Sequence, residues 1–169
     1  MLPDRNLRLM RPILCILGLL ATSTLLALPE DSKQQYEIYA PKADADADKS
    51  WTVLTGTQEN PARIKQGTML ITAPEIRYLD DHNQIQTIIA TGNPARFQQQ
   101  PKTDQELVKA SGKQLKFDNN TRNLTIDTNA ELNQGGKLTQ ANHIDYNADT
   151  GRVGGEQFRA IFPPNKAKP

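Results

Sequence analysis

Few residues of this 169-residue chain have the type and spacing that catalysis or metal binding requires. The two histidines, His82 and His143, lie in a turn cluster and at a strand start, without a cysteine or a carboxylate at metal-ligand spacing. Asp44, Asp46 and Asp48 offer the oxygen ligands that calcium prefers, but their segment lacks the glycine that bends a loop round an ion. We therefore expect no catalytic residue, no metal and no cofactor, and a protein that is not an enzyme.

The dominant feature of the chain is an internal repeat. The segment Ile38-Tyr39-Ala40-Pro41 returns as Ile71-Thr72-Ala73-Pro74, and Asn60-Pro61-Ala62-Arg63 returns at the same offset as Asn93-Pro94-Ala95-Arg96. Two unrelated tetrapeptides at the same offset indicate that one supersecondary unit has been copied. Repeats of this length are typical of solenoids, propellers and stacked hairpin arrays.

Weaker copies of the unit follow along the chain at less regular offsets. Ile76-Arg77-Tyr78 is echoed by Leu115-Lys116-Phe117 and then by Ile144-Asp145-Tyr146. Apolar and polar residues alternate in these segments, as they do in half-buried antiparallel strands. Clusters of Asn, Asp and Gly separate the segments, and such residues favour tight turns. The pattern predicts an all-β fold of repeated strand-turn-strand units.

Within these units we expect the chain to turn corners at three positions and to form a turn in the first, least regular unit. The corners are expected at Gly56, at Gly92 and near Asn129. The turn is expected over residues 43–48, where Ala and Asp alternate.

The segment 1–27 has the layout of a secretory signal peptide. An arginine-containing start precedes the apolar run 13–21, and small residues follow as far as Ala27. We expect cleavage between Ala27 and Leu28, and therefore export of the mature protein. The alternative is an uncleaved membrane anchor, although the apolar run is shorter than the roughly 20 residues that a membrane span needs.

The remainder is expected to form one domain over residues 28–162, with a disordered tail at 163–169. It has no cysteine and is poor in Leu, Ile, Val and Phe, which predicts a shallow sandwich with a half-filled interior. The 20 basic and 19 acidic residues of the chain nearly balance, which excludes the basic surplus typical of nucleic-acid binding.

These features resemble those of the OstA-like (LptA) family of lipopolysaccharide-transport proteins. The resemblance rests on the signal peptide, the repeated Pro-Ala-x-(Ile/Phe)-x-Gln segments, and the Ala-x-x-Ile-x-Tyr steps at Ala73–Tyr78 and Ala141–Tyr146. It implies a β-jellyroll of two antiparallel sheets opened as a V, with a groove for the acyl chains of lipid A. It also implies a protein located in the periplasm that binds lipopolysaccharide and joins end to end with itself. The implied partners are LptC-like and LptD-like OstA domains at the inner and outer membranes.

Fifteen apolar and aromatic residues are predicted to face inward and to bind lipid. The same pattern is typical of an ordinary core, so each residue either lines a groove or fills the core. They are Ile38, Ile64, Ile71, Ile76, Tyr78, Ile85, Phe97, Leu115, Phe117, Leu124, Ile126, Leu132, Ile144, Tyr146 and Phe158.

The ends of the sheets are predicted to be sites of association. Unpaired strands at 36–40 and 158–162 would add to the sheet of the next molecule. Arg63 and Arg96, at equal repeat positions, are of the type that pairs with lipid phosphates, but their alternation with apolar residues predicts that they point outward.

Three functions remain open at this point. The first is a bridge that shuttles lipopolysaccharide between two membranes. The second is a relative of the same fold that keeps its N-terminal segment as an anchor, as in the LptC branch. The third is a generic exported β-sandwich that binds another ligand, for which the single Trp51 offers little of the exposed aromatic platform expected.

Overall fold

The computed structural model describes residues 31–46, 51–101 and 105–164. The predicted signal peptide, Asp48 and the last five residues of the predicted tail lie outside these ranges. The described residues form strands and one short 3-10 turn, η1 (Asp31–Lys33), and contain no α-helix. The strands are β1 (Tyr36–Tyr39), β2 (Lys42–Asp46), β3 (Trp51–Thr55), β4 (Ala62–Gln66), β5 (Met69–Ala73), β6 (Glu75–Asp81), β7 (Gln84–Gln99), β8 (Val108–Asp118), β9 (Asn123–Gln134), β10 (Lys137–Asn147), β11 (Val153–Glu156) and β12 (Arg159–Ile161).

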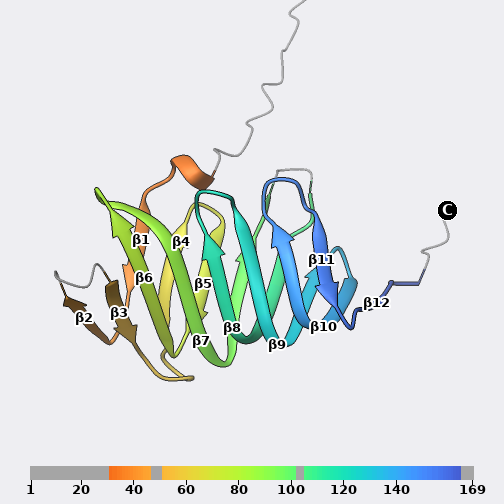
Figure 1. Cartoon of the computed structure of the whole chain (residues 1–169), viewed down its shortest axis with the longest axis horizontal. Coiled ribbons are helices and arrows are strands. Elements are labelled where there is room, and N and C mark those ends of the chain that lie inside the picture. Colours follow the sequence, from red (N-terminus) through yellow and green to blue (C-terminus); the bar gives the residue numbers. More distant parts are fainter. Residues whose placement is uncertain (1–30, 47–50, 102–104, 165–169) are drawn as a thin grey trace, which may run out of the picture.

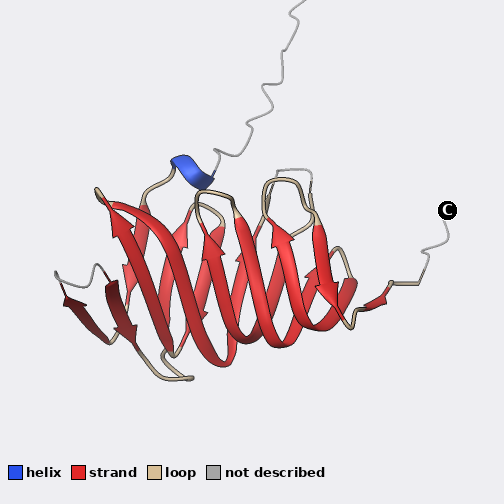
Figure 2. Cartoon of the chain, in the orientation of Figure 1, coloured by secondary structure: helices blue, strands red, loops and turns tan. Residues whose placement is uncertain are grey.

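All the described strands belong to one antiparallel sheet that folds over on itself into two layers (Figure 1 and Figure 2). The long strands β7, β8, β9 and β10 contribute one half to each layer. The front layer, nearer the viewer in Figure 1, has the order β2, β3, β6, β7, β8, β9, β10, β11. The back layer has the order β1, β4, β5, β7, β8, β9, β10, β12. The predicted all-β jellyroll is confirmed.

The sequence repeat marks the places where the chain changes layer. In the first unit the chain leaves the back layer at Ala40-Pro41, after β1, and returns at Asn60-Pro61, before β4. In the second unit it leaves at Ala73-Pro74, after β5, and returns at Asn93-Pro94, in the middle of β7. Proline suits these positions because it cannot donate a hydrogen bond to a strand ladder.

The two layers are continuous along the lower edge of Figure 1. Three strand pairs shift register there, and the predicted corners coincide with this edge. Gly56 donates its N–H to the carbonyl of Pro74 at 2.7 Å, and Asn129 lies between the two halves of β9 with a positive φ of 57°. At Gly92 a Cβ would lie 2.5 Å from Cδ of Pro74, so only glycine fits.

The hairpin turns of both layers meet along the opposite, upper edge. We call this edge the seam; its front-layer turns are residues 82–83, 119–122 and 148–151, and its back-layer turns include 67–68 and 135–136. The turn clusters predicted from Asn, Asp and Gly occur here. No described strand crosses the seam, so within the described residues the two layers are held together there by side chains alone.

The core lies between the layers and is almost closed to solvent. Its 23 hydrophobic residues are each at most 5% exposed. Phe97 of the back layer and Phe117 of the front layer meet across the interior, with ring centroids 6.1 Å apart. The apolar composition predicted a half-filled interior, whereas in this structure the side chains of the two layers bury one another.

One local prediction is wrong. Residues 43–46 were expected to form part of a turn but belong to β2, which pairs with β3 in the register Ala43↔Leu54 and Ala45↔Thr52. Ala and Asp have little intrinsic preference for strands. The unpaired edge of β3 overrides this preference, because pairing with it satisfies the backbone of both segments.

Candidate functional site

The inner faces of the two layers hold most of the residues predicted to face inward. Twelve of the fifteen are buried in the structure, and Tyr78 is partly buried against them. Their burial is compatible with an ordinary core and with a groove that lipid enters. The twelve are Ile64, Ile71, Ile76, Ile85, Phe97, Leu115, Phe117, Leu124, Ile126, Leu132, Ile144 and Tyr146.

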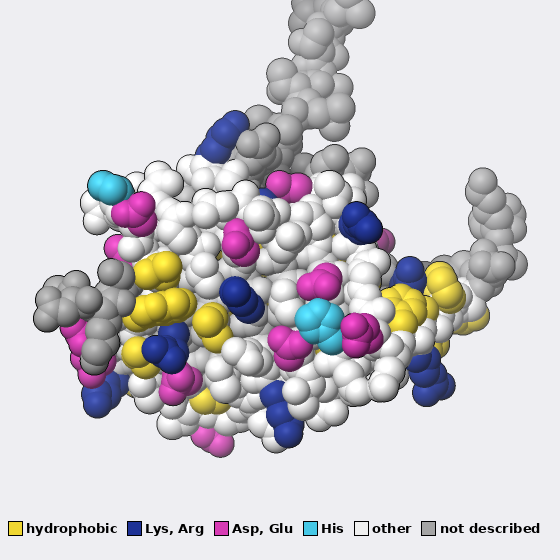
Figure 3. All heavy atoms as spheres, in the orientation of Figure 1, with side chains coloured by type: hydrophobic (Ala, Val, Ile, Leu, Met, Phe, Trp, Pro, Cys, Tyr) yellow, Lys and Arg dark blue, Asp and Glu magenta, His cyan; other side chains and the backbone are white. Residues whose placement is uncertain are grey.

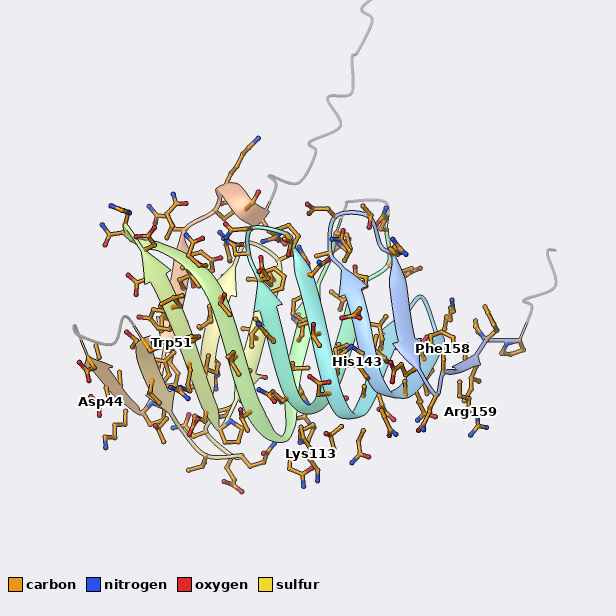
Figure 4. The ribbon with its side chains drawn as sticks, in the orientation of Figure 1. Asp44, Trp51, Lys113, His143, Phe158 and Arg159 are labelled. Atoms are coloured by element: carbon orange, nitrogen blue, oxygen red, sulfur yellow. The ribbon has the colours of Figure 1, made fainter. Side chains whose placement is uncertain are left out.

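The remaining two predicted residues lie at opposite ends of the sandwich. Ile38 of β1 is 42% exposed, although it pairs with the buried Ile64. Phe158 precedes β12 at the other end (Figure 4) and is 47% exposed. Ile161 and Phe162 of the same C-terminal segment are exposed as well. Figure 3 shows the apolar side chains near the C-terminal end as a group on the surface. The apolar inner surface therefore reaches solvent at both ends.

The same two ends carry unpaired strand edges. Among the described strands, β1 has β4 as its one neighbour and β12 has β10, so the predicted edge strands are at the ends of the back layer. In the front layer the corresponding edge strands are β2 at one end and β11 at the other. Each end of the sandwich thus presents two strand edges, one from each layer, on either side of the interior.

The seam carries a polar network that composition and alternation did not single out. Asp31 is 8% exposed, and its carboxylate accepts hydrogen bonds from the Thr68 N–H, the Thr68 hydroxyl and the Gln99 amide, each at 2.7 Å. The amide of Gln66 donates to the carbonyl of Gln34 at 3.1 Å. These contacts fasten the segment around η1 to the back layer at the seam. Gln66 and Gln99 hold equivalent positions in successive copies of the repeat, so the repeat itself was the signal that could have revealed them.

Arg122 lies at the seam on the front-layer side and is 6% exposed. Its guanidinium carbon is 4.9 Å from the centre of the Phe117 ring, and Nη1 donates to Oδ1 of Asn119 at 2.8 Å. Its Nε forms an ion pair with Oδ1 of the exposed Asp149 at 3.6 Å. Arg122 is therefore a buried cation whose charge is only loosely compensated.

Two tyrosine hydroxyls are buried at the same edge. Burial raises the pKa of Tyr36 to about 12, against an opposing effect of the positive charge of Arg122. Burial and, secondly, the carboxylate of Asp149 raise the pKa of Tyr146 to about 12. Both hydroxyls therefore stay protonated at neutral pH and remain able to donate.

The two repeat-related arginines lie on an outer face. Arg63 and Arg96 are exposed on the back layer, as their alternation predicted. Arg96 lines an open cleft of about 280 Å³ on that outer face, together with Leu70, Lys109 and Glu131 among others. This cleft is separated from the interior by the sheet itself.

His143 lies on the outer face of the front layer (Figure 4). Its Nδ1 is 2.6 Å from Oδ1 of Asp127, and its Nε2 is 3.2 Å from Oδ2 of Asp145. The hydrogen bond to Asp127 is the main cause that raises the pKa of His143. Within the described ranges no group of three His, Cys, Asp or Glu side chains has the geometry to hold a metal ion.

A sequence model for the family described as "LptA/(LptD N-terminal domain) LPS transport protein" matches residues 33–152, which is most of the described fold. The chain belongs to this family. It is 26% identical over 150 residues to the lipopolysaccharide export system protein LptH of Pseudomonas aeruginosa, an alignment that covers 85% of this chain and 83% of LptH.

The fold is also that of a solved structure in this family. The crystal structure of LptH from Pseudomonas aeruginosa, described as the LptA-homologous periplasmic component of the lipopolysaccharide transport device, superposes with a TM-score of 0.73 at 20% identity. The superposition covers 80% of this chain and all of the LptH chain. Among the residues described here, no helix is long and apolar enough to span a bilayer.

Proposed function

We propose that this protein carries lipopolysaccharide through the periplasm as one unit of a bridge between the inner and outer membranes. The family and the LptH relatives support this role, and the observation that carries it is the shape of the apolar interior. That interior runs from the β1 and β2 end to the β11 and β12 end, and apolar side chains reach the surface at both.

Acyl chains need such a path because each methylene group costs about 0.8 kcal/mol to expose to water. A multiply acylated lipid therefore crosses an aqueous gap only when its chains remain covered. The two layers are joined along one edge, and in the part of the chain that the structure describes only side chains connect them at the seam. Separation of the layers along the seam would admit the chains while the joined edge keeps the sheet intact.

The continuous path requires that successive molecules join end to end. The edges of β1 and β2 in one molecule and of β11 and β12 in the next have unpaired backbone groups that can form new ladder hydrogen bonds. Such a contact joins two different surfaces, so it repeats along a filament. We propose that OstA domains of LptC-like and LptD-like proteins occupy the two terminal edges of this filament.

The experiment that tests the proposed function places a photo-crosslinking amino acid at Ile126, which is fully buried between the layers. We expect a lipopolysaccharide adduct in intact cells. The matched control is Thr125, the preceding residue of β9, which faces outward and bonds to Asp145. Equal adducts at the two positions, or none at Ile126, would exclude an interior path.

Export of the protein itself is part of the proposal. N-terminal sequencing of the protein from the periplasm is expected to begin at Leu28. A mature protein that retains residues 13–21 would instead support the anchored relative.

A further inference from the structure

The buried polar groups without a partner are gathered at one edge of the molecule. Among the described residues, five buried side-chain atoms have no hydrogen-bond partner: Oη of Tyr36, Oε1 of Gln66, Oε1 of Gln99, Nε of Arg122 and Oη of Tyr146. All five belong to residues at the seam. Buried polar atoms are normally paired, so an unpaired group calls for an explanation.

These atoms come from both layers and face the same space. Tyr36 pairs with Gln66 at the seam end of the back layer, and Gln99 lies on the same inward face as Phe97, two residues away. Phe97 packs against Phe117, over whose ring the guanidinium of Arg122 lies. Tyr146 and Phe117 each pair with Leu124, so they belong to one inward row of the front layer.

The group combines a cation, hydroxyl donors and amide acceptors directly above an apolar interior. The carboxylate of Asp31 is taken up by Thr68 and Gln99, and that of Asp149 lies 3.6 Å from Nε of Arg122 on the exposed side. A guanidinium suits a phosphate because its N–H groups match two phosphate oxygens. The tyrosine hydroxyls can donate to the same oxygens, and the amide oxygens of Gln66 and Gln99 can accept from sugar hydroxyls. The apolar side chains below these polar groups can contact acyl chains. They offer no hydrogen-bond partner to a further polar part of the ligand.

We propose that the seam around Arg122, Tyr36 and Tyr146 binds the phosphorylated sugar head of a glycolipid whose acyl chains lie between the layers. This inference rests on the proposed function and adds the place and the chemistry of headgroup recognition. It assigns to the unpaired groups a partner that arrives only when the layers separate.

The test compares lipid A with lipid A from which the phosphates have been removed, since both have the same acyl chains. Binding is measured by displacement of fluorescent lipopolysaccharide from the purified protein. We expect the wild-type protein to bind the phosphorylated form at least about tenfold more tightly, as one charge-assisted pair provides. Arg122→Gln should remove this preference while binding of the dephosphorylated form is retained.

The tyrosines supply a test that does not depend on the folding of the Arg122 variant. Because their hydroxyls have no partner in the unliganded protein, Tyr36→Phe and Tyr146→Phe should not lower the midpoint of urea unfolding. Each should weaken binding of phosphorylated lipid A by about three- to tenfold. Tyr39→Phe is the matched control, since Tyr39 points outward from the same strand beneath Arg63 and should leave the affinity unchanged.

The outcomes separate this inference from the proposed function. Equal wild-type affinity for the two forms of lipid A would overturn the headgroup site and leave the bridge function standing. Failure to bind either form would overturn both. Inorganic phosphate is the third probe: if it binds alone with an Arg122-dependent affinity equal to that of lipid A, the seam is a site for free phosphate and the headgroup assignment is wrong.

Discussion

Ile38 of the edge strand β1 is directly opposite Ile64 of β4, yet Ile64 is fully buried and Ile38 is 42% exposed. The two side chains face the same way because paired residues of neighbouring strands point to the same side of a sheet. The apolar inner surface therefore continues from the buried strand β4 to the edge strand β1, where solvent reaches it. In an isolated molecule, an exposed apolar surface at a strand edge favours aggregation. In a molecule that joins end to end with another copy, the same surface is covered by the neighbour.

The first prediction concerns association through the terminal strand β12. Ile161→Pro removes a backbone N–H and disrupts the strand, so it should abolish concentration-dependent self-association in light scattering. Ile161→Val retains the N–H and the strand preference and should associate like the wild type. A proline variant that assembles normally would show that this edge is not the contact.

The second prediction separates the closed core from the exposed ends. Phe117 is fully buried, so Phe117→Ala should lower the free energy of unfolding by about 3–5 kcal/mol. Phe158 is 47% exposed, and Phe158→Ala should change the free energy of unfolding by no more than about 1 kcal/mol. Urea denaturation of the two variants checks this difference. Similar losses at both positions would contradict the placement of Phe158 at an open end.

The third prediction concerns the attachment of the N-terminal segment at the seam. Asp31→Ala removes the acceptor of three hydrogen bonds and leaves the Gln99 amide without that partner. The free energy of unfolding should fall by about 1–3 kcal/mol, as is typical when a buried donor loses its partner. Ser32→Ala, an exposed neighbour whose side chain makes no such contact, is the control. Hydrogen exchange of the Thr68 N–H should accelerate only in the Asp31 variant.

The fourth prediction is a dependence of stability on pH through His143. Its pKa in the folded protein is raised above the ordinary value of 6.5, first by the hydrogen bond to Asp127 and further by Asp145. Glu156 is the register partner of His143 on β11 and adds a third carboxylate to its surroundings. A raised pKa means that the protonated form stabilises the fold below about pH 6.5, and that this contribution is lost as the pH rises through the folded value.

The size of this effect is small because the His143 side chain is 37% exposed. We expect on the order of 0.5 kcal/mol, measured as the difference between wild type and His143→Gln in urea unfolding across pH 5 to 8. A difference that grows with rising pH would have the opposite sign and would contradict the assignment.

The repeat, the strands and the turns could be predicted because their signals are local. Alternation placed Leu115 and Phe117 on one face, and the Asn- and Asp-rich clusters located the turns. The first unit was harder, since Ala43 and Ala45 have no intrinsic preference for strands and are ordered by pairing with β3. Among the polar residues of the seam, Gln66 and Gln99 have a local signal in their equivalent repeat positions. Asp31 and Arg122 have none, because their role depends on how segments distant in sequence come together.

The most direct measurement of the central claim is the distance between the layers with and without lipopolysaccharide. Spin labels at Lys109 and Lys116 would lie on the outer faces of the back and front layers, where both side chains are exposed. Cys15 is the sole native cysteine and precedes the predicted mature start. A label pair at Glu75 and Lys116, both on the front layer, reports on that layer alone. If the layers separate to receive acyl chains, lipopolysaccharide lengthens the distance between Lys109 and Lys116 and leaves that between Glu75 and Lys116 unchanged. The saccharide of lipopolysaccharide without its acyl chains changes neither distance. Bound lipopolysaccharide with an unchanged distance between the layers would contradict the account.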